Sequence, residues 1–308
     1  MKHQYLDHKF SAPLLSLVGT MNAIVDEYVA QGYRLTVRQL YYQLVARDHV
    51  ENTLRSYKRV ASAINDAKMA GLMDWEAIED RTREFIRRSR WDSRSHILRS
   101  VGEQFHMDLW AGQPCRIFVV VEKEALVGVL EPTCNKYDVP LLAARGYPSG
   151  TVIHEFTESD IVPTLEKGQR VVLLHLGDHD PSGIDMTRDL TDRIRLFVED
   201  PIEGSGLDSS DIEAWDLTRI ALNRDQIAQY KPPPNPAKAT DARFKQYAKV
   251  HGRSSWELDA LRPEVLAELL ESNILKHVDS GVLKARTEEI LENRERLMEI
   301  ADEEEATE

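Results

Sequence analysis

The most constraining feature of this sequence is a short apolar run that ends in two aspartates. Residues 171–176, Val-Val-Leu-Leu-His-Leu, are rich in aliphatic and β-branched side chains, and Gly-Asp-His-Asp-Pro-Ser-Gly follows them. Such a run predicts a strand that is buried on both faces, as in a parallel sheet. Open α/β sheets bind ligands outside the carboxyl ends of their strands. We therefore expect Asp178 and Asp180 at a ligand site, with a helix starting near Ile184.

A second strand upstream also ends in an acid. Residues 116–121, Arg-Ile-Phe-Val-Val-Val, run directly into Glu122. Carboxylates held close together repel one another unless a cation lies between them, and Mg²⁺ binds one or two carboxylates together with water and phosphate. We therefore predict that Glu122, Asp178 and Asp180 bind Mg²⁺. In the structural alternative, Asp178 caps the amino terminus of a helix and Glu122 is a solvated acid. We expect Lys123, which follows Glu122, to be solvated.

Charge is unevenly distributed along the chain. Lys and Arg total 39 against 52 Asp and Glu, and the formal net charge of −13 argues against indiscriminate binding to nucleic acid. One stretch nevertheless holds seven arginines against two acids, with arginine at positions 81, 83, 87, 88, 90, 94 and 99. Such a basic stretch predicts an electrostatic contact, and we expect Arg87 and Arg88 to bind DNA. Residues 301–308 predict a disordered acidic tail.

Length and composition indicate a two-domain protein with packed cores. Of the 308 residues 42% are hydrophobic, yet no apolar run approaches the ~20 residues of a membrane span, and the amino terminus does not resemble a signal peptide. The two cysteines form no disulfide framework. We expect a soluble cytoplasmic protein with no membrane partner. We place the domain boundary near Gln113, which gives domains 1–112 and 113–300.

The first part of the chain predicts three helices, over residues 12–30, 36–45 and 53–70. Thr36 and Gln39 have the spacing of a capping box at the start of the second helix. The third helix carries basic residues that we expect to contact DNA, namely Arg55, Lys58 and Arg59. Three short helices with a basic third helix indicate a helix-turn-helix module, in winged form, whose third helix meets DNA. An ordinary three-helix bundle with a solvated charged face is the alternative.

The second part alternates between strands and helices, which is typical of an α/β fold with a parallel sheet. The expected strands and helices are strand 116–121, helix 125–136, strand 140–144, helix 151–158, strand 170–176, helix 184–198 and strand 215–222. A helix over 93–109 precedes them. A stiff, non-helical, proline-rich connector at 231–236 follows, and helices over 264–277 and 283–300 complete the chain.

Several of these motifs together resemble one protein family. Thr36-Val37-Arg38-Gln39-Leu40-Tyr41-Tyr42 resembles the Arg-x-x-Tyr-Tyr motif of the topoisomerase VI A subunit and of the meiotic double-strand-break transesterase. Glu122 with Asp178-x-Asp180 resembles the TOPRIM pattern of topoisomerases, primases and related nucleases. Arg145-Gly146-Tyr147-Pro148 and Trp256-Glu257-Leu258-Asp259-Ala260-Leu261 are similar to further blocks of the A subunit. The resemblance covers most of residues 34–265 and is closest to the compact stand-alone relatives called mini-A.

The resemblance implies a fold and a reaction. It implies a winged-helix (CAP-like) DNA-binding domain that carries a tyrosine nucleophile, followed by a TOPRIM domain with a helical carboxyl-terminal part. Tyr42 would attack a DNA phosphodiester to give a 5′-phosphotyrosine, while Arg38, one helical turn earlier, holds the phosphate. Tyr41 and Tyr42 lie about 100° apart around a helix, so at most one of them can face DNA. The resemblance favours Tyr42, although both can instead be core aromatics.

Three functions remain open at this point. The first is a DNA transesterase of the type IIB topoisomerase kind, acting with Mg²⁺. The second is a TOPRIM nuclease that uses metal-activated water, and the third is a DNA-binding scaffold without activity. Arg38 with Tyr42 favours the first. Because cutting both strands needs two tyrosines, a homodimer is expected, and the resemblance implies active sites shared between protomers. The sequence gives no sign of an ATPase partner subunit.

Overall fold

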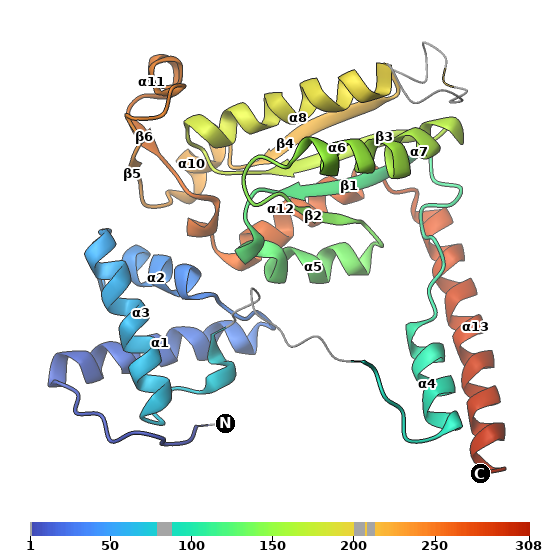
Figure 1. Cartoon of the computed structure of the whole chain (residues 1–308), viewed down its shortest axis with the longest axis horizontal. Helices are drawn as coiled ribbons and strands as arrows, with labels where there is room; N and C mark the ends of the chain where they lie inside the picture. Colours follow the sequence, from blue (N-terminus) through green and yellow to red (C-terminus); the bar gives the residue numbers. More distant parts are fainter. Residues whose placement is uncertain (1, 79–87, 200–206, 208–212) are drawn as a thin grey trace.

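The computed structural model contains an amino-terminal group of helices beside an α/β unit (Figure 1). It describes residues 2–78, 88–199, 207 and 213–308. The expected α/β class with a parallel sheet is confirmed.

The three expected amino-terminal helices are present: α1 (Ala12–Ala30), α2 (Val37–Ala46) and α3 (Leu54–Met69), followed by the short 3₁₀ helix η1 (Trp75–Ala77). The capping box begins α2: the Thr36 amide donates to Gln39 Oε1 at 2.8 Å, and the Gln39 amide donates to Thr36 Oγ1 at 3.3 Å. A winged helix also needs strands. Within the described residues 2–78 the β pairing is limited to the isolated bridges Gln4–Ala70 and Leu35–Ile78, so the winged form stays a prediction.

A four-stranded sheet forms the centre of the α/β unit. Its strands are β1 (Cys115–Val121), β2 (Leu141–Ala143), β3 (Arg170–Leu176) and β4 (Trp215–Ala221), in the spatial order β2-β1-β3-β4. All the pairings are parallel. The central strands β1 and β3 are buried almost throughout, as their continuous apolar runs predict. The carboxyl ends of these two strands therefore lie next to each other.

Helices cover both faces of the sheet (Figure 1). One face packs on α5 (Val127–Lys136), which follows the one-turn helix η2 (Glu124–Leu126), and on α12 (Pro263–Leu275). The other face packs on α6 (Gly150–Phe156), α7 (Val162–Glu166) and α8 (Pro181–Glu199), with the π-helical turn η3 (Thr157–Ile161) joining α6 to α7. The helix α8 starts at Pro181, three residues before the expected position, because Pro is well suited to a first helical turn.

The segment after β4 returns to the edge of the sheet. It comprises α10 (Arg224–Tyr230), β5 (Asn235–Pro236), α11 (Phe244–His251), β6 (Ser254–Ser255) and the 3₁₀ turn η4 (Leu258–Ala260). Strands β5 and β6 pair antiparallel, so the proline-rich connector is partly a short strand. The helix α11 was not expected from the sequence.

Two helices far apart in sequence form an arm: α4 (Arg94–Gln104) and α13 (Ser280–Glu305) lie side by side (Figure 1). The expected disorder of residues 301–308 is wrong, because α13 continues to Glu305. Basic residues of α4 neutralise this acidic end: Arg94 lies 2.9 Å from Glu304, and Arg99 pairs with Asp302 and Glu305. None of the helices in the described ranges is long and apolar enough to cross a membrane.

Candidate active site

Glu122 and Asp178 meet at the carboxyl edge of the sheet because they follow the adjacent strands β1 and β3. The Asp178 amide donates a hydrogen bond to Glu122 Oε2 at 2.7 Å. Gly183 makes this approach possible: a Cβ at that position would lie 2.3 Å from the Asp178 carbonyl oxygen and 3.0 Å from Glu122 Oε2. The glycine of the Asp-x-Asp-Pro-x-Gly motif is thus required for close packing. The alternative of a solvated Glu122 is wrong.

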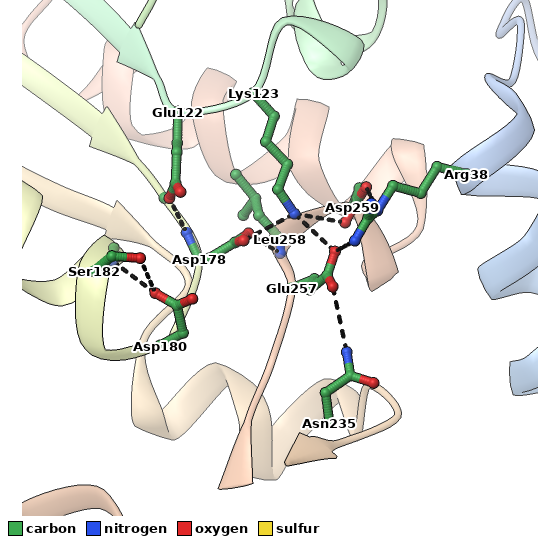
Figure 2. A network of polar contacts seen from close by, with 12 residues as sticks. Arg38, Glu122, Lys123, Asp178, Asp180, Ser182, Asn235, Glu257, Leu258 and Asp259 are labelled. Carbon is green, nitrogen blue, oxygen red and sulfur yellow. Dashed lines mark hydrogen bonds and ion pairs between the residues drawn. The ribbon is translucent and has the colours of Figure 1, made fainter. Parts of the chain in front are cut away.

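The two aspartates of the motif have different partners (Figure 2). Asp180 Oδ1 accepts hydrogen bonds from the Gly183 amide at 2.7 Å and from Ser182 Oγ at 2.9 Å, in the first turn of α8. Asp178 Oδ1 accepts from the Leu258 amide at 2.8 Å. The helix-capping role considered for Asp178 therefore belongs to Asp180, while Asp178 ties β3 to η4.

Lys123 is not the solvated lysine expected from the sequence. Its ammonium group lies 2.9 Å from Asp178 Oδ2 and 3.0 Å from a carboxylate oxygen of both Glu257 and Asp259. Figure 2 shows the ammonium at the centre of these three carboxylates. Burial opposes the charge on Lys123, but the three carboxylates outweigh it and raise the pKa of Lys123. The lysine is a largely enclosed internal cation, with 21% of its side chain exposed.

Burial and mutual repulsion change the acidity of the carboxylates. Burial raises the pKa of Asp178 to about 7, with Lys123 opposing this shift and Glu122 adding to it. Burial also raises the pKa of Glu122, and the charge of Asp180 contributes in the same direction. Glu257 behaves differently: although burial opposes ionisation, Lys123 and Arg38 hold its pKa at about 2. Glu257 is therefore stable as an anion in this site. Asp178 and Glu122, whose pKa values are raised, need a nearby cation to stay ionised.

The residues at this edge fit Mg²⁺ through two carboxylates. Glu122 and Asp180 supply hard oxygen ligands, and Mg²⁺ binds one or two carboxylates while keeping water or phosphate as its other ligands. Asp178 has both carboxylate oxygens engaged, by Leu258 and Lys123. Within the described ranges no three His, Cys, Asp or Glu side chains form a ready metal cluster. To complete the expected set of three ligands, Asp178 would have to give up its contact with Lys123 and bind the ion instead.

Arg38 and Tyr42 lie on the same side of α2, as their spacing predicts, with the guanidinium carbon 5.9 Å from the centre of the Tyr42 ring. The guanidinium is already bound by the chain's own acids. Its Nε lies 3.0 Å from Asp259 Oδ2, and one terminal nitrogen donates to Glu257 Oε2. The side chain is still 43% exposed. Arg38 thus reaches from the amino-terminal helices to the edge of the sheet.

Tyr42 is buried, with 3% of its surface exposed. Asn235 Nδ2 donates to its hydroxyl oxygen at 3.3 Å. Burial raises the pKa of Tyr42, and the negative charges of Glu257 and Asp259 contribute. A cavity of about 320 Å³ lies beside the ring, lined by residues of α2, α3 and the β5 segment. In this arrangement Tyr42 is a protonated phenol shielded from solvent.

Tyr41 points elsewhere, as the angular separation around a helix predicts. Its hydroxyl lies 3.0 Å from Asn52 Oδ1 and 3.1 Å from the Thr53 carbonyl oxygen. Its ring contacts Tyr57 edge-on. These contacts fix Tyr41 within the amino-terminal helices. Tyr41 still lines the cavity that Tyr42 and Glu257 share, but its hydroxyl is held by Asn52 and Thr53.

Two buried histidines and an arginine support this edge, and the charge of Arg219 opposes the rise in the pKa of Glu122. His175 lies within β3, where Nδ1 is 2.9 Å from Thr187 Oγ1, and burial lowers the pKa of His175 to about 3. His179 packs against Trp256 and Tyr247, and burial lowers its pKa to about 4. Arg219 on β4 donates to the carbonyl oxygens of Gly177 and Asp178 at 2.7 and 2.6 Å. These groups hold the loop after β3 in place.

The residues expected to bind DNA are partly described. Arg55, Lys58 and Arg59 are exposed on α3, and their spacing places them on neighbouring positions of one helical face. Leu54 and Tyr57 of the same helix line the cavity beside Tyr42. Arg88 is exposed, whereas Arg87 lies outside the described residues. Arg94 and Arg99 are engaged by α13, so they are not part of a free basic surface.

The sequence did not reveal that Lys123, Glu257, Asp259 and Asn235 belong to this site. Glu257 and Asp259 repeat the one-residue spacing of Asp178 and Asp180, which was a usable signal. Asn235 stands in a proline-rich segment, and no pattern in that segment indicates a contact with Tyr42. The position of Lys123 could not be predicted because its three partners come from the loop after β3 and from residues 257–259. No family model and no curated protein matches this chain.

Proposed function

We propose that this protein is a DNA transesterase of the topoisomerase VI A kind, with the amino-terminal helices as its winged-helix domain and the α/β unit as its TOPRIM domain. One observation carries the proposal. Arg38 on α2 contacts Glu257 and Asp259, and Lys123 joins those two carboxylates to Asp178 at the edge of the sheet (Figure 2). Tyr42 lies on the same side of α2 as Arg38, which supports a nucleophile beside a phosphate-binding group.

The proposed reaction uses each group in a defined role. The Tyr42 oxygen attacks the phosphorus of a DNA phosphodiester, its bond to phosphorus forms, and the bond to the 3′ oxygen breaks. The proton leaves the phenol and the 3′ oxygen gains one, so the products are a 5′-phosphotyrosine and a free 3′-hydroxyl. The forked guanidinium of Arg38 binds the non-bridging oxygens and stabilises the charge that develops on them. Mg²⁺, held by Glu122 and Asp180, would supply electrostatic stabilisation of the phosphate and leaving oxygen.

The same proposal includes two partners, DNA and a second copy of the chain. Each chain offers one Tyr42, so cutting both strands of a duplex needs two chains in a symmetric dimer. The exposed basic residues belong to α3, the helix whose Leu54 and Tyr57 line the cavity beside Tyr42, which supports DNA binding by this helix.

A metal-dependent nuclease is the second candidate, and one observation favours it. The Tyr42 hydroxyl is buried and its pKa is raised, so in the observed arrangement it is a poor nucleophile. In a nuclease, water attacks the phosphate and Tyr42 has a structural role only.

One experiment separates the two candidates. Supercoiled plasmid is incubated with the protein and Mg²⁺, the mixture is denatured, and DNA ends are examined for covalently attached protein. The transesterase gives 5′-linked protein, and Tyr42→Phe abolishes the linkage without unfolding the chain, since only a hydroxyl is removed. Tyr41→Phe is the matched control and should retain linkage. DNA cleaved by the wild type without attached protein would support the nuclease and reject the transesterase.

A further inference from the structure

Arg38 is the feature on which this inference is built. A phosphodiester binds arginine through the same planar N–H donors that a carboxylate uses. In this structure those donors face Glu257 and Asp259 of the same chain. Asp259 has no exposed side-chain surface, and Glu257 is held ionised by Lys123 and Arg38. The phosphate-binding group is therefore already occupied by two internal anions.

Charge repulsion prevents a phosphate from joining the two carboxylates at the same nitrogens of Arg38. A phosphodiester at Arg38 would stand within a few ångströms of the Glu257 and Asp259 carboxylates, and like charges at that distance repel strongly in a partly buried site. Arg38 can thus offer its Nε and the terminal nitrogen that donates to Glu257 to its own carboxylates or to a DNA phosphate, but not to both at once. Binding of a phosphate through these donors requires the guanidinium to leave Glu257 and Asp259.

The same contacts also shield the tyrosine. Asn235 Nδ2 lies 3.3 Å from the Tyr42 hydroxyl oxygen and 3.5 Å from Glu257 Oε1, so it links the phenol to the carboxylate that binds Arg38. Asn52, which precedes α3, donates to Asn235 Oδ1 at 2.8 Å. Polar side chains thus join the amino-terminal helices to the segment from β5 to η4, and Figure 2 shows Arg38, Asn235 and Glu257 among them. Such hydrogen bonds and ion pairs can be exchanged for contacts with an anionic ligand.

We propose that Glu257 and Asp259 form an intramolecular latch: they occupy Arg38 in place of a DNA phosphate and keep Tyr42 shielded until a phosphodiester displaces them. This inference rests on the proposed function of Arg38 and Tyr42 and adds a regulatory contact to that site. Glu257 and Asp259 are positioning residues, since they act through Arg38. Lys123 compensates their charge on the opposite side and remains with them when Arg38 leaves.

The first test measures shielding without DNA. The protein is treated with N-acetylimidazole, and acetylation of Tyr42 and Tyr41 is followed separately by mass spectrometry. Glu257→Gln keeps the shape of the side chain and removes its charge, and it should raise the Tyr42 rate about tenfold, within the range of couplings between contacting residues. Tyr41 lines the same cavity, but its hydroxyl is also held by the Thr53 carbonyl oxygen, so its rate should rise much less and serves as the internal reference.

A matched variant controls for charge alone. Glu124→Gln removes one acid close to the same edge, where Glu124 pairs with Arg145 and not with Arg38. It should leave the Tyr42 rate unchanged. If Glu257→Gln, folded by circular dichroism, also leaves that rate unchanged, the latch is wrong. Because this readout needs no cleavage, it decides the latch even if no protein–DNA linkage is ever found.

The second test measures competition at Arg38. Affinity for a short duplex is compared in the wild type, Glu257→Gln, Arg38→Gln and the double variant, at one salt concentration and without Mg²⁺. The latch predicts that Glu257→Gln tightens binding about tenfold when Arg38 is present and much less when it is absent. An equal gain in both backgrounds, or an equal gain from Glu124→Gln, would mean that only the overall charge matters and would overturn the proposal.

Discussion

Replacing Lys123 by Met should destabilise the protein by about 3 kcal/mol at pH 8. The substitution keeps the length of the side chain but leaves Asp178, Glu257 and Asp259 without the ammonium group that lies 2.9–3.0 Å from each. Removing one partner of a buried ion pair costs about 3–5 kcal/mol. The lower value is expected because Arg38 still binds two of the carboxylates. Since the folded pKa of Lys123 is raised above 10.5, the contribution is fully present at pH 8 and is lost only as pH rises through the folded value.

The assay is urea unfolding without divalent ions, and Lys136→Met is the matched control. Lys136 also lies within 3 Å of a carboxylate, that of Glu271, but its side chain is 62% exposed, so its loss should change the free energy of unfolding by less than about 1 kcal/mol. The reasoning is refuted if Lys123→Met destabilises the protein no more than Lys136→Met does. Addition of Mg²⁺ should stabilise Lys123→Met more than the wild type, because the substitution frees Asp178 to bind the ion.

Further measurements test other parts of the structure. Asp180→Ala should abolish Mg²⁺-dependent cleavage and also lower the free energy of unfolding by about 1 kcal/mol, because it removes the acceptor in the first turn of α8; unchanged unfolding in urea would contradict that contact. Cys134 should react with Ellman's reagent at pH 8 only after unfolding, since burial raises its pKa to about 12; rapid labelling of the folded protein would show that the thiol is accessible. Arg59→Ala should weaken DNA binding similarly for all sequences and flatten the slope of log K against log salt by about 0.9; an unchanged slope means that Arg59 does not contact phosphate.

The secondary structure was predictable wherever local chemistry determines it. The capping box at Thr36 begins α2, and the apolar runs that form β1 and β3 needed no partner to be recognised as buried strands. The acidic end of the chain was wrongly expected to be disordered, because its own composition does not indicate which distant residues pair with it. Arg94 and Arg99 on α4 neutralise that end. A property that depends on a contact between remote segments cannot be read from either segment alone.

The site was predictable to a different degree. The spacing of Arg38 and Tyr42 placed them on one side of a helix, and strand ends brought Glu122 and Asp178 together. The function of these residues stays a proposal. What the sequence could not reveal is that Lys123 lies among carboxylates from other elements, because that requires η4 to pack against the end of β3. Local motifs therefore identified the reactive side chains. Their electrostatic partners depend on tertiary packing and could not be identified from the sequence.

The pairing of α4 with α13 has a consequence for how the chain matures during synthesis. Arg99 and Glu305 are in contact although 206 positions separate them. At about 5–20 residues per second, a ribosome needs roughly 10–40 s to make the intervening chain. The amino-terminal helices can close their own core in that time, but α4 has to wait for α13. Until α13 is made, Arg94 and Arg99 lack the acids with which they pair, so the arm is the last part of the protein to form.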